Sequence, residues 1–480
     1  MIRSYQMQDQ RVPKRKKYAL SYFKGINTTV AEEVLPFSYS PKSYNFCFGK
    51  GVLDPGYGVE AAYVVTEDGR WQIKRRGITV KFLKFFHYTM HNLTQRLEKL
   101  VAYASDGQLY DMTLNELYSG FVPLGSYGEV TDAVPYLYNG DDGMLLSTTT
   151  GLYFLRENLV TELPFSGVCT TMCAHSDRVF AVLKSDEYKL YFSDDLDPAN
   201  WQISLKEGGY LAFDTQMGKV VKVLSFAGHV YLFFEHGVMR LTAYNLQTEF
   251  NLQKLYLSPG AIYPSTVAVC GDRILFAASD GIFVFDGVSI KKVMEEVCEL
   301  MDTDQKAAFA VHHGGKYYLA CRMNMDSLIT GANNSLLVYD VWKQTFDVAH
   351  DLKILSMISL DLDTVRGVLT NVDYPSDYLG LITKCGAVDE SPTLKLWQSP
   401  VATLGEHAGK KFLREVRVRC EGSGVLKVTL DGATKEYALS AGLNKVRVMR
   451  AFDKIGVALS FTAAAARVTV AELVVDHYGE

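Results

Sequence analysis

The chain has 480 residues, of which 48% are hydrophobic and 21% are charged, and its formal net charge is −5. This balance is typical of a soluble globular protein with a core of its own, and it excludes a disordered chain, a collagen and a long coiled coil. Aromatic residues make up 12%, and 38 Gly stand against 13 Pro, which favours an all-β chain with many tight turns.

The first 45 residues differ from the rest in charge. Residues 1–24 carry seven positive charges and one negative charge, a net of +6, which leaves −11 for the remainder. No apolar stretch follows, so we expect no signal peptide. We predict an extended N-terminal arm over residues 1–45 that contacts an acidic neighbouring subunit, with contacts to nucleic-acid phosphates or a solvated run as alternatives. The candidate interface residues are Arg11, Lys14, Arg15, Lys16 and Lys17.

One pattern recurs along the middle of the chain: a short apolar run, a turn of Gly, Asp, Ser or His, and an aromatic-rich apolar run. Seven copies begin at residues 100, 144, 179, 230, 274, 317 and 368, or about 45 residues apart. A strand–turn–strand unit of this length is typical of a propeller blade. We therefore predict a β-propeller of about six to seven blades over residues 46–398, with unrelated hairpins in stacked sandwiches as the alternative.

Helical and membrane signals are sparse. Thr94–Leu100 is a short amphipathic candidate, and Val288–Met301 has Lys and Glu spaced three and four apart. We expect both to be helical inserts on an all-β body. The most apolar window, Val220–Phe234, is interrupted by Lys222 and His229 and is too short to span a bilayer, so we predict no membrane-spanning segment.

The character of the chain changes near residue 400. From Lys410 onward apolar residues such as Val416 and Val418 alternate with Arg417 and Arg419, and further strand-like runs follow. About five strands in so short a stretch predict a small C-terminal β-sandwich or jelly-roll module over residues 399–480.

Three patterns have the residue types of a metal site, and each has a simpler structural reading. Asp-rich turns at residues 141–142, 193–197 and 361–363 lack the spacing of a calcium loop. His87 and His91 lack the glutamate of a zinc helix. Cys169 and Cys173, near His175, fall on one face of a strand and read as core residues. We predict no metal site.

Catalytic signals are also weak. The eight cysteines have no framework spacing, and we expect buried, reduced thiols. No nucleophile elbow, P-loop or dinucleotide fingerprint is present, and nothing marks the facing carboxylates of a glycosidase. We predict that the protein is not an enzyme and has neither catalytic residues nor a cofactor.

Several segments resemble one family. Residues 22–27 (YFKGIN), 39–45 (YSPKSYN) and 51–56 (GVLDPG) resemble the opening of tailed-phage virion proteins. Residues 190–201 (LYFSDDLDPANW) and 228–240 (GHVYLFFEHGVMR) are similar to two recurring hairpin segments of the β-propeller tail proteins of short-tailed phages, which comprise packaged-DNA stabilisation and tail nozzle proteins. The matching residues, which we read as structural, are Ser193, Asp197, Pro198, Trp201, Glu235 and Gly237.

Residues 193–201 are also similar to the sialidase Asp box, but Asp197 stands where that turn has Gly, and Trp201 comes one residue late.

The family resemblance implies a structural virion protein. It implies a subunit of a hexameric ring that extends the portal and adaptor, contacts packaged DNA non-specifically, and is made in the cytoplasm of the bacterial host. It transfers no catalytic residue, and the module after Lys410 does not map onto the family, which leaves open an anchor for a fibre, spike or glycan. The alternative function is a carbohydrate-binding or glycoside-hydrolysing propeller that acts in host-surface recognition, with tyrosines lining its sugar site.

Overall fold

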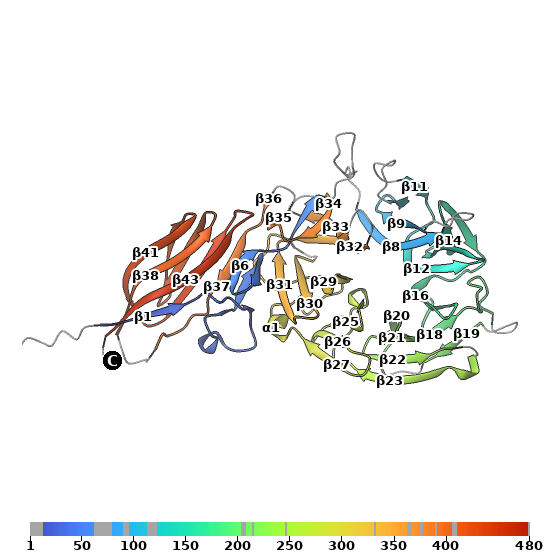
Figure 1. The fold of residues 1–480 in the computed structure, drawn as a ribbon. Coiled ribbons are helices and arrows are strands. Elements are labelled where there is room, and N and C mark those ends of the chain that lie inside the picture. The colour runs from blue at the N-terminus through green and yellow to red at the C-terminus, as the bar shows by residue number, and fades with distance from the viewer. Residues whose placement is uncertain are drawn as a thin grey trace, which may run out of the picture. The chain divides into compact units, whose positions relative to one another are not determined.

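The structure is a computed structural model, and the regular secondary structure of its described residues is nearly all strand (Figure 1). It describes residues 13–61, 79–89, 96–112, 122–202, 208–213, 216–244, 247–330, 333–361, 366–374, 378–388, 391–405 and 410–478. Within these ranges the helical elements are α1 (Glu295–Cys298) and three 3-10 turns, η1 (Glu32–Val34), η2 (Gln247–Glu249) and η3 (Pro264–Thr266). None of the described helices has the length and hydropathy to cross a bilayer. The predicted all-β class is confirmed.

The chain divides into two compact units. Unit 1 combines Met1–Val59, Phe346–His350 and Thr383–Glu480, and unit 2 combines Glu60–Thr345 and Asp351–Ile382. This division differs from the expected one, because the N-terminal residues are grouped with the C-terminal strands and not as a separate arm. The reason lies in the sheets of unit 1, described below.

Unit 2 is built from small antiparallel sheets that follow one another in chain order (Figure 1). In its described residues there are seven, each named here by its first strand. The first three are β8 (Val80–Thr89)–β9 (Arg96–Ala104)–β10 (Leu109–Asp111)–β11 (Val122–Gly125), β12 (Val130–Tyr138)–β13 (Asp141–Thr148)–β14 (Leu152–Arg156)–β15 (Leu159–Leu163), and β16 (Cys169–His175)–β17 (Arg178–Leu183)–β18 (Asp186–Phe192)–β19 (Gly209–Ala212).

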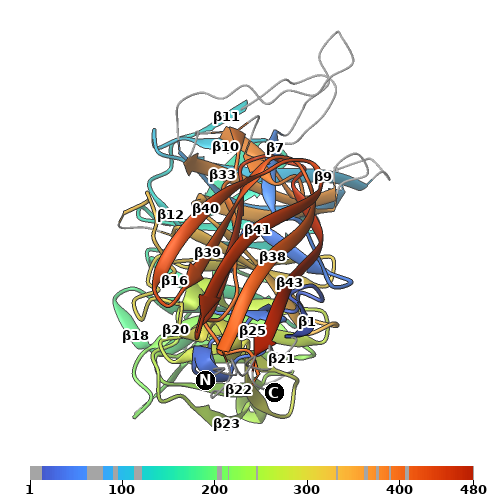
Figure 2. The same cartoon turned by 90° about the vertical axis from the view of Figure 1, so that its left-hand side faces the viewer.

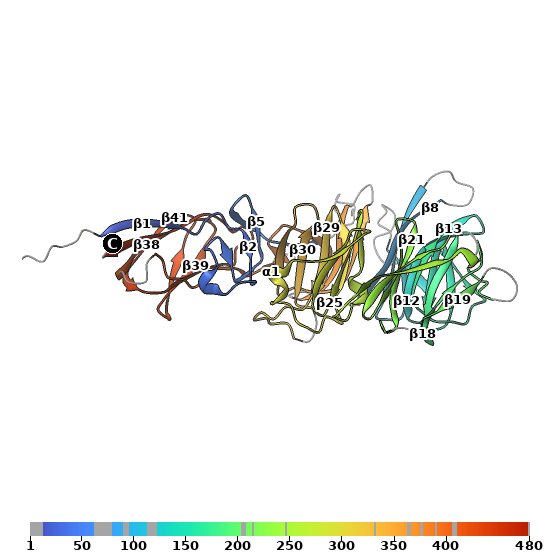
Figure 3. The same ribbon diagram turned by 90° about the horizontal axis from the view of Figure 1, so that it is seen from below.

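The other four continue the same pattern. They are β20 (Val220–Phe226)–β21 (His229–Phe234)–β22 (Gly237–Thr242)–β23 (Asn251–Leu257), β24 (Ala268–Cys270)–β25 (Arg273–Ala278)–β26 (Gly281–Phe285)–β27 (Ile290–Val293), β28 (Phe309–His313)–β29 (Lys316–Cys321)–β30 (Ser335–Asp340), and β32 (Lys353–Asp361)–β33 (Arg366–Tyr374)–β34 (Tyr378–Thr383). Figure 3 views unit 2 from below, with strands such as β12, β13, β18 and β19 standing next to one another.

The predicted hairpin repeat is confirmed. Each of the seven predicted starts lies in the second strand of one sheet: β9, β13, β17, β21, β25, β29 and β33. The second apolar run of each repeat forms the third strand, which pairs antiparallel with the second. The structure adds a first strand to every repeat, which the sequence pattern did not mark.

The first strands share an irregularity. Five of them hold one extra residue that has no partner on the second strand, so the pairing register shifts at a β-bulge. The extra residues are Leu83, Thr131, Thr170, Val221 and Leu355. Because successive side chains of a strand alternate in direction, each bulge moves the residues after it to the opposite face.

Side chains of the first strands connect neighbouring sheets. Thr131 Oγ1 donates to the Cys169 carbonyl at 2.7 Å, and the Val223 amide donates to Thr171 Oγ1 at 3.2 Å. The last sheet meets the first in the same way, since Ser356 Oγ donates to the Val80 carbonyl. Apolar residues of these two sheets form one core: Val80, Leu100, Ala102, Ala104, Tyr110, Met112, Leu360, Leu369 and Leu379.

Both helix predictions are wrong. Residues 96–100 of the first candidate belong to strand β9, where Leu100 and Ala102 pack in one core cluster and Val101 between them packs in another. In the second, Ile290–Val293 pairs with β26, and Met294 has a left-handed φ of 56° that interrupts any helix. Only the four residues of α1 remain helical.

Unit 1 is a sandwich of two antiparallel sheets, whose strands lie side by side in Figure 2. One sheet has the order β41–β38–β43–β6–β5, with β1 also paired to β43, and the other has the order β4–β37–β42–β39–β40. Their bounds are β1 (Lys14–Ala19), β4 (Lys42–Tyr44), β5 (Phe46–Gly49), β6 (Val52–Pro55), β37 (Lys395–Gln398), β38 (Lys410–Glu421), β39 (Gly424–Leu430), β40 (Ala433–Leu439), β41 (Gly442–Phe452), β42 (Ile455–Phe461) and β43 (Arg467–Tyr478). Shorter strands are β2 (Gly25–Ile26), β3 (Tyr39–Ser40), β7 (Gly58–Ala61), β31 (Thr345–His350), β35 (Ala387–Val388) and β36 (Ser391–Pro392).

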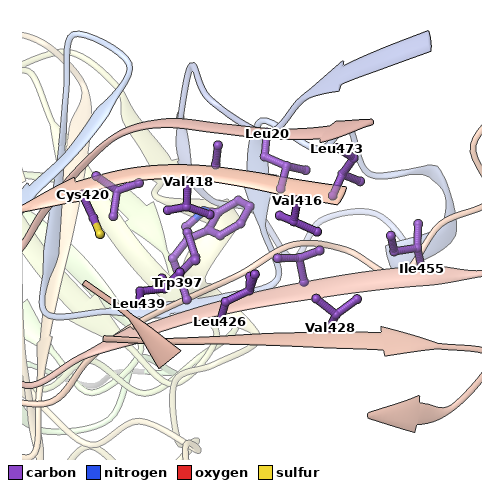
Figure 4. Close-up of a cluster of buried hydrophobic side chains, with 14 of the residues drawn as sticks. Leu20, Trp397, Val416, Val418, Cys420, Leu426, Val428, Leu439, Ile455 and Leu473 are labelled. Carbon is purple, nitrogen blue, oxygen red and sulfur yellow. The ribbon is translucent and has the colours of Figure 1, made fainter. Parts of the chain in front are cut away.

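The core of the sandwich takes residues from both ends of the chain. Leu20, Phe46 and Leu53 from the N-terminal segment are fully buried in the same cluster as the C-terminal strands. Figure 4 shows Leu20 of this segment beside Val416 and Leu473 of the C-terminal strands, with the Trp397 ring in the same cluster. Without the N-terminal residues this apolar surface would be open to water, so the segment predicted as an arm is an integral part of the sandwich.

Lys395 is a fully buried cation of unit 1. Its ammonium donates to three carbonyls, those of Gly386 at 2.8 Å, Ala463 at 3.0 Å and Thr393 at 3.3 Å. Burial lowers the pKa of Lys395 to about 8, from an ordinary value of 10.5. At a pH between these two values, the Lys395 amine therefore binds its proton more tightly in the unfolded chain than in the folded chain.

This imbalance predicts a pH-dependent stability. Between pH 8 and 10.5 the unfolded state holds more protons, so the contribution of Lys395 to the free energy of unfolding rises with pH. We expect the free energy of unfolding of the wild type, relative to that of Lys395→Met, to rise by up to about 3 kcal/mol across this pH window. Chemical denaturation across the window measures it, with Lys427→Met, at a side chain 49% exposed, as the control. A difference that stays constant with pH would contradict the prediction.

Candidate functional site

Unit 2 has a cavity of about 660 Å³. Its lining comes from the first strands of all seven sheets, with η3 preceding β24, and includes the five bulge residues. Most of the lining is apolar, with Leu83, Ala133, Val221, Val267, Ala268, Val269, Phe309, Ala310, Val311, Leu355, Met357 and Ile358. The bulges therefore help to shape this cavity.

Asp132 is the single carboxylate among the lining residues of this cavity. It accepts hydrogen bonds from the Met172 amide at 2.8 Å and from the Ala133 amide at 2.9 Å, and it lies 3.6 Å from Lys222 Nζ. These contacts join three successive sheets. Glycoside hydrolysis needs two carboxylates on either side of the scissile bond, so this lining does not provide that chemistry.

The other polar groups of the lining are mostly occupied or cationic. Thr170 Oγ1 donates to the Val182 carbonyl at 3.1 Å, and Ser359 Oγ contacts His313 Nδ1 at 3.0 Å. Burial, and the neighbouring His313, lower the pKa of His312, which keeps its ring neutral near pH 7. Lys81 and Lys222 bring positive charge to the wall.

The segment that resembles phage tail proteins after β18 forms a closed turn. Ser193 is fully buried, and its Oγ accepts from the Val179 amide at 3.0 Å. Asp197 Oδ1 accepts from the Ala199 amide at 3.1 Å, and Trp201 Nε1 donates to the Pro198 carbonyl at 2.7 Å. The Trp201 ring lies 4.8 Å from that of Phe165. All four residues named for this motif hold the turn against the β16 sheet, to which it belongs, and against the end of the β12 sheet before it.

The second such segment is the β21–β22 hairpin. The Glu235 amide donates to the Lys219 carbonyl at 3.0 Å, and its carbonyl accepts from the Ile262 amide at 2.8 Å. Gly237 has no room for a side chain, because a Cβ would lie 2.7 Å from the Tyr256 carbonyl oxygen. Glu235 therefore joins the turn to adjacent segments, and Gly237 permits close strand packing.

The N-terminal segments of the resemblance meet one another in unit 1. Asn45 is buried, and its side chain donates to the Leu394 carbonyl at 2.6 Å and accepts from the His350 amide at 2.7 Å. The Gly56 amide donates to the Asn45 carbonyl at 2.9 Å, an approach so close that a Cβ on Gly56 would lie 2.4 Å from that oxygen. The asparagine and the glycine of these motifs thus form one structural contact.

The basic residues of the predicted arm lie in strand β1, apart from Arg11, which is outside the described residues. Strand β1 pairs antiparallel with β43. Arg15 Nε donates to Asp476 Oδ1 at 2.9 Å, and Lys17 Nζ lies 4.0 Å from Glu472 Oε1. Lys14 and Lys16 pair through the backbone opposite His477 and Val475. The structure thus places four of the five candidate residues on the edge of the sandwich.

The cysteine prediction needs a correction. Cys169 and Cys173 were expected on one face of a strand, but the bulge at Thr170 lies between them and reverses the alternation. Cys169 packs in the cluster that holds Leu145 and Met172, whereas Cys173 packs in the cluster that holds Phe192 and Phe234.

The metal and thiol candidates are otherwise placed as follows. In the parts of the chain that the structure describes, no three His, Cys, Asp or Glu side chains gather as a metal site. His175 contacts Ser225 Oγ at 2.9 Å. The His87 side chain and His91 lie outside the described residues. All eight cysteines are free, and six are buried. Burial raises the pKa of Cys169, Cys270 and Cys321 to about 12, so these thiols stay protonated.

Comparisons with known proteins add little. No family model matches the chain, and no curated protein matches it. Among solved structures, it is similar to the extracellular domain of BT4673 of B. thetaiotaomicron, with 11% identity and a TM-score of 0.40 over 63% of this chain and 39% of that one. A second structure of that domain gives 12% and 0.39 over the same shares.

It is also similar to PorZ, a surface component of the type-IX secretion system of Porphyromonas gingivalis, with 12% identity and a TM-score of 0.35 over 80% of this chain and 46% of that one. The chain spans less than half the length of each of these structures. Likenesses at this level carry no argument about function.

Proposed function

We propose that the chain is a structural virion protein of a phage tail, a ring-forming nozzle or DNA-stabilisation subunit below the portal and adaptor. In this proposal unit 2 is a seven-bladed β-propeller, and the protein is not an enzyme. The observation that carries the proposal is the position of the family-like residues. None of them lines the cavity of unit 2, and each that is described holds a turn, a hairpin or the core of unit 1.

The propeller is supported by contacts that run once around unit 2. The first strands of neighbouring sheets contact in the pairs β8–β12, β12–β16, β16–β20, β24–β28, β28–β32 and β32–β8, and β20 contacts η3, which leads into β24. Radial sheets of this kind leave a central space lined by their first strands, as the cavity lining is. Stacked sandwiches would not bring the seventh sheet back onto the first.

The alternative function, a sugar-binding or glycoside-hydrolysing propeller, has less support. Its chemistry requires paired carboxylates, and the cavity offers only Asp132, whose oxygens already accept two backbone amides. The family resemblance, in contrast, asks for no catalytic group.

Imaging of native particles tests the proposal. Negative-stain or cryo-electron microscopy should show the chain as a six-fold ring next to the portal, and antibody labelling of the chain should mark that ring. Particles without such a ring would refute the nozzle assignment. Release of reducing ends from host polysaccharide by the purified chain would favour the alternative.

A further inference from the structure

One outer face of the unit 1 sandwich is strongly basic. It is formed by strands β1, β43, β38 and β41, whose opposite face packs into the core. The name "basic face" is used here for its seven cationic residues, Arg15, Lys17, Arg414, Arg417, Arg419, Lys445 and Arg447. Figure 2 shows β41, β38 and β43 of this sheet next to one another, with β1 beside β43. Cations from the two ends of the chain therefore share one surface.

Four of these seven cations are compensated within the sheet. Asp476 is paired with Arg15 at 2.9 Å and with Arg414 at 3.0 Å. Arg417 bonds to Glu415 and, at 2.9 Å, to Glu472. Burial opposes ionisation of Asp476, but the two guanidiniums together hold its pKa below the ordinary value. This part of the face is thus a stable ionic network.

The other three cations carry unbalanced charge. Arg419, Lys445 and Arg447 are all exposed, and none of them makes an ion pair with another described residue. Strand β41 holds two of them and is the edge strand of its sheet. Leu443 and Met449, 48% and 53% exposed, lie on the same strand. Lysine on an edge strand discourages strand addition, but a surplus of three cations beside exposed apolar side chains is also typical of a docking surface.

The charge of the chain is divided between its two units. Unit 1 contains 23 Lys and Arg against 16 Asp and Glu, a net of +7. Unit 2 contains 26 against 38, a net of −12. Each copy of the protein therefore carries both a basic surface and an acidic body, which is the condition for head-to-tail association.

Six acidic residues of unit 2 lie at one end of two adjacent sheets. In antiparallel sheets the turns after the first and third strands lie at the same end. In the β12 and β16 sheets these turns, with the first two residues of β13, hold Asp141, Asp142, Glu157, Asp177, Asp195 and Asp197, called here the "acidic end". The Leu196 amide bonds to the Asp177 carbonyl at 3.0 Å, which brings the last three together. Besides burial, these three carboxylates raise the pKa of Tyr136.

We propose that the basic face of one copy docks on the acidic end of unit 2 in a second copy. The proposal rests on the proposed ring function and adds the surfaces that join its subunits. A contact between two different surfaces, repeated by a rotation that divides a full turn evenly, closes into a ring. The unpaired cations of β41 meet the exposed carboxylates of Asp177 and Asp195, and Leu443 and Met449 are covered.

A second copy fits the basic face better than nucleic acid does. Glu415, Glu472 and Asp476 lie among the cations and would repel phosphates. The chain as a whole is also acidic, with a net charge of −5. An acidic protein surface, in contrast, can place its own cations opposite these three carboxylates, as Arg156 lies beside Asp141 at 2.9 Å.

The test is self-association of the full chain by analytical ultracentrifugation at about 50 mM and about 500 mM salt. We expect concentration-dependent assembly at low salt that weakens at high salt. Arg419→Glu/Lys445→Glu/Arg447→Glu should weaken it by about tenfold or more. Asp177→Lys/Asp195→Lys should do the same, and the combination of both sets should recover assembly. The control Lys24→Glu/Lys50→Glu/Lys435→Glu changes the same charge on exposed residues outside the basic face and should associate like the wild type.

Three results would overturn the proposal. The wild type could stay monomeric at low salt, or the basic-face variant could associate like the wild type. The combined variants could also fail to recover assembly although thermal melting shows that they are folded. A DNA duplex of about 30 base pairs that binds the wild type but not the basic-face variant, without self-association, would assign the face to nucleic acid. Particle imaging tests the proposed function separately from these two surfaces. A particle without a six-fold ring refutes that function even where the chain associates in solution.

Discussion

Replacing Asp111 by Ala is expected to lower the free energy of unfolding of unit 2 by about 3–5 kcal/mol. The Lys99 side chain is only 2% exposed, and its ammonium lies 2.7 Å from Asp111 Oδ2 and 2.5 Å from Asn158 Oδ1. Without the carboxylate, the buried Lys99 ammonium keeps the neutral Asn158 amide as its one partner among the described residues. Thermal and chemical denaturation of the full chain measure the loss.

An exposed pair in the same unit is the matched control. Asp361 lies 3.2 Å from Arg366, and their side chains are 74% and 69% exposed. Asp361→Ala should therefore cost only about 0–1 kcal/mol. The double variant Lys99→Met/Asp111→Leu should recover much of the loss, because it removes both buried charges. A cost for Asp111→Ala no larger than that for Asp361→Ala would contradict the buried-pair account.

The hairpins of unit 2 were predictable because their signal is local. Val230–Phe234 and Val238–Leu241 are dense apolar runs around a Gly turn, and the structure buries nearly all of them in β21 and β22. Part of the family-like turn is local in the same way, since Ser193 Oγ bonds to the Asp194 carbonyl and Trp201 Nε1 to the Pro198 carbonyl. In each case the residues that define the element also lie next to one another in the chain.

The first strands and the cavity were not predictable from the same signal. Strand β16 begins Cys169-Thr170-Thr171, and its bulge at Thr170 breaks the alternation on which a strand is recognised. Both hydroxyls bond to backbone groups of other strands, Thr170 to Val182 and Thr171 to Val223. In β16, small hydroxyl residues in a short, irregular apolar run were the sign of the strand, and that sign is common to loops.

The assembly of unit 1 could not be read from the sequence because its contacts are non-local. Asn45 bonds to residues 305 and 349 positions away, and Arg15 bonds to Asp476 at a separation of 461. The basic run at Lys14–Lys17 is typical of a solvated arm. Its neighbour Leu20, fully buried in the sandwich core, carries no local sign of where it packs.

This shared core leads to the second large prediction. Trp397→Ala is expected to destabilise unit 1 by about 3–5 kcal/mol, because the ring is fully buried and meets Phe23 edge-on at 4.9 Å. Since Phe23 belongs to the N-terminal segment, the loss should also loosen residues 13–59. We expect limited proteolysis of the full chain to cut this segment faster in the variant, and differential scanning calorimetry to show a lower transition for unit 1 alone.

Two variants sharpen this result. Trp397 Nε1 is buried without a hydrogen-bond partner among the described residues, so Trp397→Phe removes an unsatisfied donor and should cost clearly less than Trp397→Ala. Trp342→Ala, at a side chain 65% exposed in unit 2, should change stability by no more than about 1 kcal/mol and leave N-terminal cleavage unaltered.

If Trp397→Ala lowered the unit 1 transition while residues 13–59 resisted the protease as in the wild type, the N-terminal segment would hold its fold independently of this core. The sandwich would then belong to the C-terminal strands alone, and the basic face would lose the strand that contributes Arg15 and Lys17.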